Sequence, residues 1–165
     1  MRWRRIKTNA KMKQYINTIK TENVNNFTVE FNRLENIIFP SFLEWDNCVL
    51  LSQQKESELP THFSSNQFVS DRTAFEADYN HIHLNDIFDE GVHPDLILNI
   101  GIKILEVWTA VLYKEFNGLR KFMLILSYDA EEVVLRFYNV RKNEVPWLDS
   151  AKLDSYLDGL MLIEI

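Results

Sequence analysis

The sequence predicts an α+β fold in a single domain, in which an antiparallel β-sheet packs against a long central helix and N-terminal helices. Three observations predict it. The chain has 165 residues, 46% of them hydrophobic, which is long enough for one well-buried core and short for two. Residues 92–116 form a long apolar run with helical periodicity. Residues 121–140 and 160–165 have the composition of a β-hairpin and a further strand.

The central helix is expected at about residues 94–117. Pro94 suits a first helical turn, and Gly118 can adopt the left-handed conformation that ends helices. A narrow stripe of polar residues runs along an otherwise apolar cylinder, so the helix must be covered on several sides. Charged residues within the run make a membrane span too costly, and no membrane association is expected. The stripe consists of Asp95, Asn99, Lys103, Glu106 and Lys114.

Residues 1–20 are interpreted as a basic leader or a short helix, and residues 21–165 as one globular domain. The first 20 residues hold seven of the 18 Lys and Arg residues and none of the acidic ones. Apolar residues at 15, 16 and 19 give a short helical face. Met12 offers a second start, so whether residues 1–11 are native is left open.

A second core helix is expected before Pro40, with Thr28 as its N-cap. Its apolar residues recur at helical spacing: Phe27, Phe31, Leu34, Ile37 and Ile38. Residues 48–51 are apolar and too short for periodicity to distinguish a strand from the end of a helix. Residues 53–71 are polar and are interpreted as a long loop with a brief strand at 67–69, which makes the loop a candidate contact surface.

The second half of the chain is expected to supply the sheet. Residues 81–84 alternate like a half-buried strand. Residues 121–128 and 132–140 are two apolar or alternating runs joined by an acidic turn, which predicts an antiparallel hairpin that buries one face on the central helix. Residues 160–165 are apolar enough to form a last strand of the same sheet.

A short helix is expected between the hairpin and that last strand. Ser150 is a candidate N-cap, Gly159 would end the helix, and its apolar residues are Leu153, Tyr156 and Leu157.

No catalytic motif is present in the sequence. Glycine-rich phosphate loops, the nucleophile elbow and the paired histidines of zinc proteases are all missing. The lone Cys48 precedes three apolar residues, an environment that keeps a thiol neutral and inert. One cysteine excludes an internal disulfide and fits a reducing, cytoplasmic compartment. We therefore expect no enzymatic activity and no cofactor.

His81 and His83 are two residues apart, so both imidazoles point to one side of a strand. A metal site needs three or four ligands, and only His93, Asp86 and Asp89 lie near enough in sequence to complete one. Histidines bonded to backbone or carboxylate groups are the favoured interpretation, and no metal is expected.

Charge is distributed unevenly along the chain. From residue 21 onward, 11 basic residues face 24 acidic ones, a formal charge of −13. Such a body repels nucleic acid and anionic membranes and attracts basic surfaces, although solubility alone would also account for it. The one basic cluster in this part, Arg136, Arg141 and Lys142, is too small for phosphate-driven binding.

The block from His81 to residue 165 contains HIHLNDIF, a central helix with a Trp, LRFYNVRKNEVPWLD and a closing strand. It resembles immunity proteins encoded beside bacterial polymorphic or contact-dependent growth inhibition toxins. The resemblance covers about half of the chain. It implies a stoichiometric inhibitor that binds a cognate toxin, in many cases a basic nuclease, and needs no catalytic group.

Under this hypothesis the toxin would contact two acidic clusters and several exposed aromatic residues. The clusters are Asp86, Asp89, Glu90 and Asp95, and Asp129, Glu131 and Glu132; the aromatic candidates are Tyr128, Tyr138 and Trp147. Two alternatives remain open at this point. One is a small metal- or ligand-binding domain that uses His81 and His83, and the other is a self-associating structural or regulatory protein.

Overall fold

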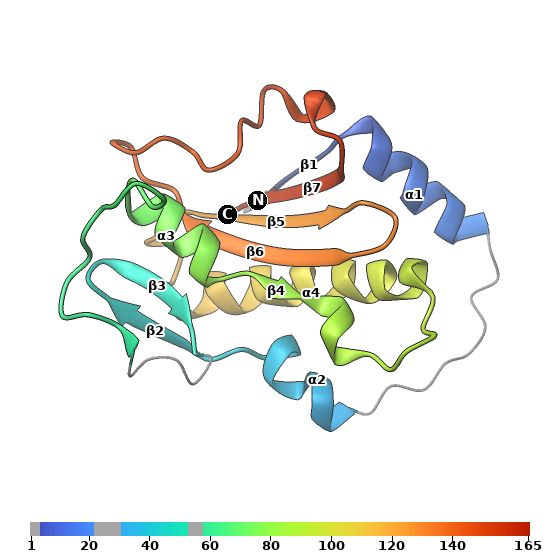
Figure 1. Ribbon diagram of the computed structural model, residues 1–165, viewed down its shortest axis with the longest axis horizontal. Helices are drawn as coiled ribbons and strands as arrows, with labels where there is room; N and C mark the ends of the chain where they lie inside the picture. The colour runs from blue at the N-terminus through green and yellow to red at the C-terminus, as the bar shows by residue number, and fades with distance from the viewer. Residues whose placement is uncertain (1–3, 22–30, 53–57) are drawn as a thin grey trace.

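The computed structural model describes residues 4–21, 31–52 and 58–165 and has the predicted α+β architecture (Figure 1). Within these residues a five-stranded antiparallel sheet has the order β1-β7-β5-β6-β4, and β2 and β3 form a separate hairpin. The strands are β1 (Arg5–Thr8), β2 (Phe42–Trp45), β3 (Cys48–Leu51), β4 (Ile82–His83), β5 (Phe122–Tyr128), β6 (Val133–Asn139) and β7 (Gly159–Glu164). The helices are α1 (Ala10–Thr21), α2 (Phe31–Ile38), α3 (Arg72–Tyr79) and α4 (Pro94–Glu115), with short 3-10 helices η2 (Leu84–Ile87) and η3 (Leu153–Ser155).

Helix α4 lies along one face of the sheet, as predicted (Figure 1). It begins at Pro94 and ends two residues before the expected end, where Gly118 adopts a φ of +66°. Helix and sheet approach closely at Gly101, because a Cβ there would lie 2.9 Å from Cγ1 of Val133. By length and composition α4 is apolar enough to cross a membrane, and 44% of its most apolar window is buried inside the protein.

Both faces of the sheet are covered. Val133, Leu135 and Phe137 of β6 face α4, as the alternation predicted, and belong to the main core. The opposite face holds a second core in which Ile125, Tyr138 and Leu162 pack under Leu148 and Leu153. This second cover was not predicted, because residues 140–158 fold over the sheet without a periodic apolar pattern.

The first described residues belong to the sheet. Strand β1 pairs with β7 along its whole length, from Arg5 opposite Glu164 to Thr8 opposite Met161. The sequence indicated only a leader or a short helix here. Residues 5–7 are exposed, so no alternation of buried and exposed residues reveals the strand.

Asn9 connects β1 to α1 and is almost completely buried. Its Oδ1 accepts hydrogen bonds from the backbone N–H groups of Met12 and Leu160, at 2.9 Å each. Its Nδ2 donates to the carbonyl oxygens of Leu153 and Asp158. One amide therefore fixes the start of α1 and the approach to β7, and α1 then buries Met12 against the main core.

Helix α3 joins the β2–β3 hairpin to the main sheet. On its buried face, Oε1 of Glu76 accepts the N–H of Val49 at 2.7 Å, and Oε2 accepts the N–H of Asn139 at 2.7 Å. One turn later Oδ1 of Asn80 accepts the N–H of Leu51. Side chains thus satisfy strand backbone groups that have no neighbouring strand at this position. Residues 48–51 are therefore a strand, which the sequence left undecided.

Three further expectations are resolved within the described residues. The second core helix is present as α2, although Thr28 lies outside the described residues. No strand forms at residues 67–69, because Oδ1 of Asn66 accepts the N–H groups of Phe68 and Val69 in a turn. The short helix after Ser150 is reduced to η3, whose N-cap is Lys152, and Gly159 begins β7.

Candidate functional site

Both acidic clusters predicted from the sequence lie at one end of the molecule. The β5–β6 turn, η2 with its connection to α4, and the first turn of α4 meet at the same end of the sheet (Figure 1). We call this surface the acidic end and define it by its seven carboxylates: Asp86, Asp89, Glu90, Asp95, Asp129, Glu131 and Glu132.

Asn85 of η2 fixes the two clusters relative to each other. Its Nδ2 donates to the carbonyl of Glu131, and its Oδ1 accepts the N–H of Val133, both at 2.8 Å. Tyr128 adds a second link, because its hydroxyl donates to Oδ1 of Asp95 at 2.8 Å. Residues more than 30 positions apart therefore share one rigid surface.

Three of the seven carboxylates stabilise the local structure. Oδ1 of Asp129 accepts the N–H groups of Glu132 and Glu131, which lowers the pKa of Asp129 below its usual value. Asp95 accepts from Tyr128, whose pKa is raised by burial and by this bond. Glu132 contacts Nδ1 of His83 at 2.5 Å.

Five of the seven residues are exposed to solvent on elements held by the contacts described above. They are Asp86, Asp89, Glu90, Asp129 and Glu131. Exposed charges on elements that are already held in place are suited to steering a basic partner. Binding then does not have to order these elements.

The aromatic candidates do not join this surface. Tyr128 and Tyr138 are 2% and 1% exposed, so their expected role as exposed anchors is wrong. In β6, Tyr138 faces the second core, which residues 140–158 cover. Trp147 is 42% exposed, and Arg136 lies 4.1 Å from its ring centroid. Arg136 also donates to the carbonyl of Ala77, so Trp147 adjoins α3.

His81 and His83 lie together in an open groove of about 490 Å³. Their ring centroids are 5.1 Å apart, and both are half-buried. The remaining lining comes from α2, α3, β4 and η2: Ile37, Asp78, Tyr79, Ile82, Asp86 and Ile87. In the described part of the chain, no group of three or more metal-ligating side chains is placed to hold an ion.

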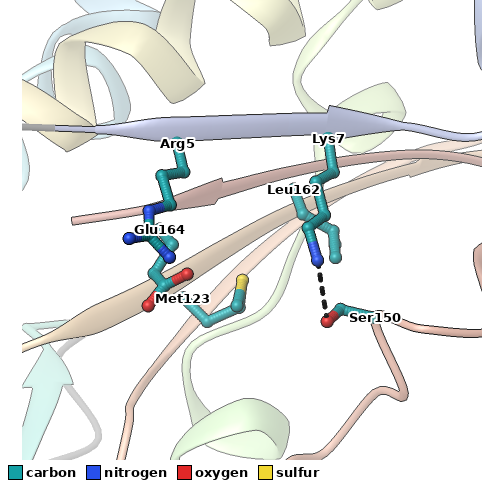
Figure 2. Close-up of a pocket in the computed structure, with 6 residues that line it drawn as sticks. All are labelled: Arg5, Lys7, Met123, Ser150, Leu162 and Glu164. Carbon is teal, nitrogen blue, oxygen red and sulfur yellow. Dashed lines mark hydrogen bonds between the residues drawn. The ribbon is translucent and has the colours of Figure 1, made fainter. Parts of the chain in front are cut away.

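A smaller pocket lies on the sheet face opposite α4 (Figure 2). Nζ of Lys7 donates to Oγ of Ser150 at 3.3 Å beside it. Its volume of about 20 Å³ has room for one water molecule but not for an organic ligand. Its lining residues are Arg5, Lys7, Met123, Ser150, Leu162 and Glu164.

Cys48 is fully buried, as expected. Burial, followed by the nearby Glu76 carboxylate, raises the pKa of its thiol to about 12. The thiol is therefore neutral and shielded, which does not suit a nucleophile.

Sequence reasoning missed the buried polar group around Glu76, Asn80 and Arg141. The first two residues are separated by four positions, which places them on one face of a helix. This spacing was the available signal, but polar residues on the solvent-exposed face of a helix have the same spacing. Only the position of α3 between two strands shows that these residues are buried.

The comparisons with known proteins give one match. The family model described as "Uncharacterized protein PM0498 family" matches residues 7–165. Neither the curated proteins nor the solved structures include a match.

Proposed function

We propose that this chain, which belongs to the uncharacterized protein PM0498 family, is an immunity protein that binds a cognate bacterial toxin and neutralises it by stoichiometric inhibition. The acidic end is the proposed toxin-binding surface. The observation that carries the proposal is the convergence of seven carboxylates from three segments on one rigid surface, with five of them exposed. The resemblance of residues 81–165 to immunity proteins supports the same function.

This function fits the chemistry of the chain. An inhibitor of this kind needs a stable surface that covers or distorts the toxin's active site, and it needs no catalytic group. A basic toxin, such as a nuclease, would associate rapidly with a chain of formal charge −6 that carries seven carboxylates at one end, because complementary charge raises the association rate. The proposal includes action in the cytoplasm, in keeping with the single reduced cysteine.

Co-expression tests the proposal. The partner is the C-terminal domain encoded by the gene immediately upstream, produced from an inducible promoter together with the full chain. We expect growth to be restored and a one-to-one complex to co-purify. Persistent toxicity without complex formation would contradict the immunity function.

Charge reversal tests the surface. Asp86→Lys, Glu90→Lys and Glu131→Lys alter exposed carboxylates for which the structure shows no side-chain hydrogen bond, so the fold should be retained. Combined, they should slow association with the toxin domain by at least about tenfold at low salt. Matched reversals at the exposed Glu35 and Glu115 should have little effect; Glu115 lies at the opposite end of α4 from Asp95. Equal effects from both sets would rule out the acidic end as the docking surface.

A further inference from the structure

The His81–His83 groove has a chemistry that the proposed function does not use. The two imidazoles lie side by side at the entrance to β4, and the open groove leaves space above them for solvent or a ligand. His83 is 40% exposed at its side chain, so the pair is accessible without any rearrangement of the fold.

Hydrogen-bond partners orient both rings in the same way. Nδ1 of His81 contacts the backbone carbonyl of Asp78, and Nδ1 of His83 contacts the carboxylate of Glu132. A carbonyl or carboxylate oxygen only accepts, so each Nδ1 carries the proton. In the neutral rings, the lone pair of each histidine is therefore on Nε2. This is the arrangement found in metal-ligating histidines, where the second nitrogen is held by an acceptor.

The separation of the rings also fits a shared ion. With a metal–nitrogen distance of about 2.0–2.1 Å and a tetrahedral angle, two imidazole centroids around one zinc ion lie roughly 5.2 Å apart. The observed separation is 5.1 Å, with the rings at 77° to each other. Rotation of a ring about its metal–nitrogen bond does not alter this distance, so the angle is compatible.

The surroundings favour a cation. Asp78 and Asp86 line the groove, and Glu132 bonds to His83, so three carboxylates lie around the imidazole pair. We propose that His81 and His83 form a two-histidine site for a divalent transition-metal ion such as Zn²⁺, bound through both Nε2 atoms. Water, or a donor group from another molecule, completes the coordination in the open groove. Neutral imidazole is a common ligand for such ions, whereas Mg²⁺ and Ca²⁺ prefer oxygen.

Calorimetric titration of the untagged full chain with ZnCl₂ tests the site. We expect one ion per chain, and a loss of affinity of at least about tenfold in His81→Ala and in His83→Ala, since each removes one of two ligands. The chain's other two histidines provide matched controls: His62→Ala and His93→Ala should bind zinc like the wild type. Glu132→Gln should weaken binding by about tenfold, because it removes the charged acceptor behind His83.

A second measurement reports on the ligands directly. Long-range ¹H–¹⁵N spectra of the histidine rings should show both His81 and His83 protonated at Nδ1, with Nε2 resonances that shift when zinc is added. Absence of zinc binding by the wild type would overturn the proposal. So would retained affinity in the His81→Ala/His83→Ala double variant, or an equal loss in the control variants. None of these outcomes depends on the toxin, so the immunity function is tested separately.

Discussion

Arg141 donates a hydrogen bond from Nη1 to Oε2 of Glu76 at 2.7 Å, and the carboxylate that it neutralises is fully buried. The same carboxylate accepts the N–H groups of Val49 and Asn139. Glu76 therefore connects α3, β3, β6 and the segment after β6 through a single side chain. Every described bond to it comes from a donor, which is the condition for a stable buried charge.

Replacing Glu76 should strongly destabilise the fold. Glu76→Leu leaves the Arg141 charge and two backbone N–H groups without their acceptor, and we expect a loss of about 3–5 kcal/mol in the free energy of unfolding. Urea denaturation measures this loss. Asp78→Ala, at an exposed position of the same helix, should change stability by less than about 1 kcal/mol.

The double variant Glu76→Leu/Arg141→Met separates the ion pair from the other bonds. It should lose less than the sum of the two single variants, because neither partner of the Glu76–Arg141 pair then remains without the other. Additive losses would show that the pair contributes nothing of its own.

Asn9 should contribute strongly to the stability of the fold, although it lies near the start of the chain. Asn9→Ala removes the acceptor of two backbone N–H groups and the side-chain donor to the carbonyls of Leu153 and Asp158, with an expected loss of at least about 2 kcal/mol. A chain started at Met12 removes β1 as well and should be less stable still in thermal denaturation. Gln14→Ala, at an exposed position of α1, serves as the comparison. A Met12-started chain as stable as the full one would contradict the role of β1.

Acid should weaken the attachment of the loop before α3. Asp46 accepts the N–H of Phe63 and pairs with Arg72 at 2.8 Å, and these contacts lower its pKa below the ordinary value of 3.8. A lowered folded-state pKa stabilises the protein above pH 3.8, and this contribution is lost as the pH falls toward the folded-state value. Asp46→Asn should therefore have a lower melting temperature than the wild type at pH 7, and the difference should shrink below about pH 4. A difference that grows with acidity would contradict this assignment.

The Cys48 thiol should be unreactive in the native protein. A fully buried thiol with a pKa of about 12 is neither accessible nor ionised at neutral pH. Modification by a chromogenic disulfide should be no faster than unfolding and should become rapid in denaturant. Fast labelling without denaturant would reveal local opening of β3.

The contact between Arg136 and Trp147 should hold residues 140–158 on the sheet. A double-mutant cycle with Arg136→Met and Trp147→Leu should give a coupling of about 0.5–2 kcal/mol, the range of a partly shielded cation–π contact. Zero coupling would contradict a stabilising contact between Arg136 and Trp147. Trp147 would then be available for the toxin contact that was expected from the sequence.

Regular periodicity explains which parts of the fold the sequence predicted. α4, the β5–β6 hairpin and β7 are long enough to show their period, and each was located to within a few residues. α3 was missed because its buried face carries Thr73, Glu76 and Ala77, which do not form an apolar stripe. Its polar side chains are explained only by strand backbones that lie far away in the sequence.

The candidate site shows the same limit. The acidic residues were identifiable by type, but their convergence depends on Asn85 and Tyr128, whose partners lie 33 to 48 residues away. Residue type also does not show that Asp95, Asp129 and Glu132 bond to neighbouring groups. Tyr138 was misjudged because strand alternation predicts a second face without predicting what covers it.

The outer strands of the sheet restrict how another polypeptide can be recognised. β1 has four residues, two of them the cations Arg5 and Lys7, and β4 has only two residues. Edges so short offer few backbone groups with which an incoming strand could pair. They therefore disfavour both amyloid-like growth and donor-strand complementation. Selectivity for a partner would then be encoded by side chains, and it could diverge among relatives while the hydrogen-bonded framework stays unchanged.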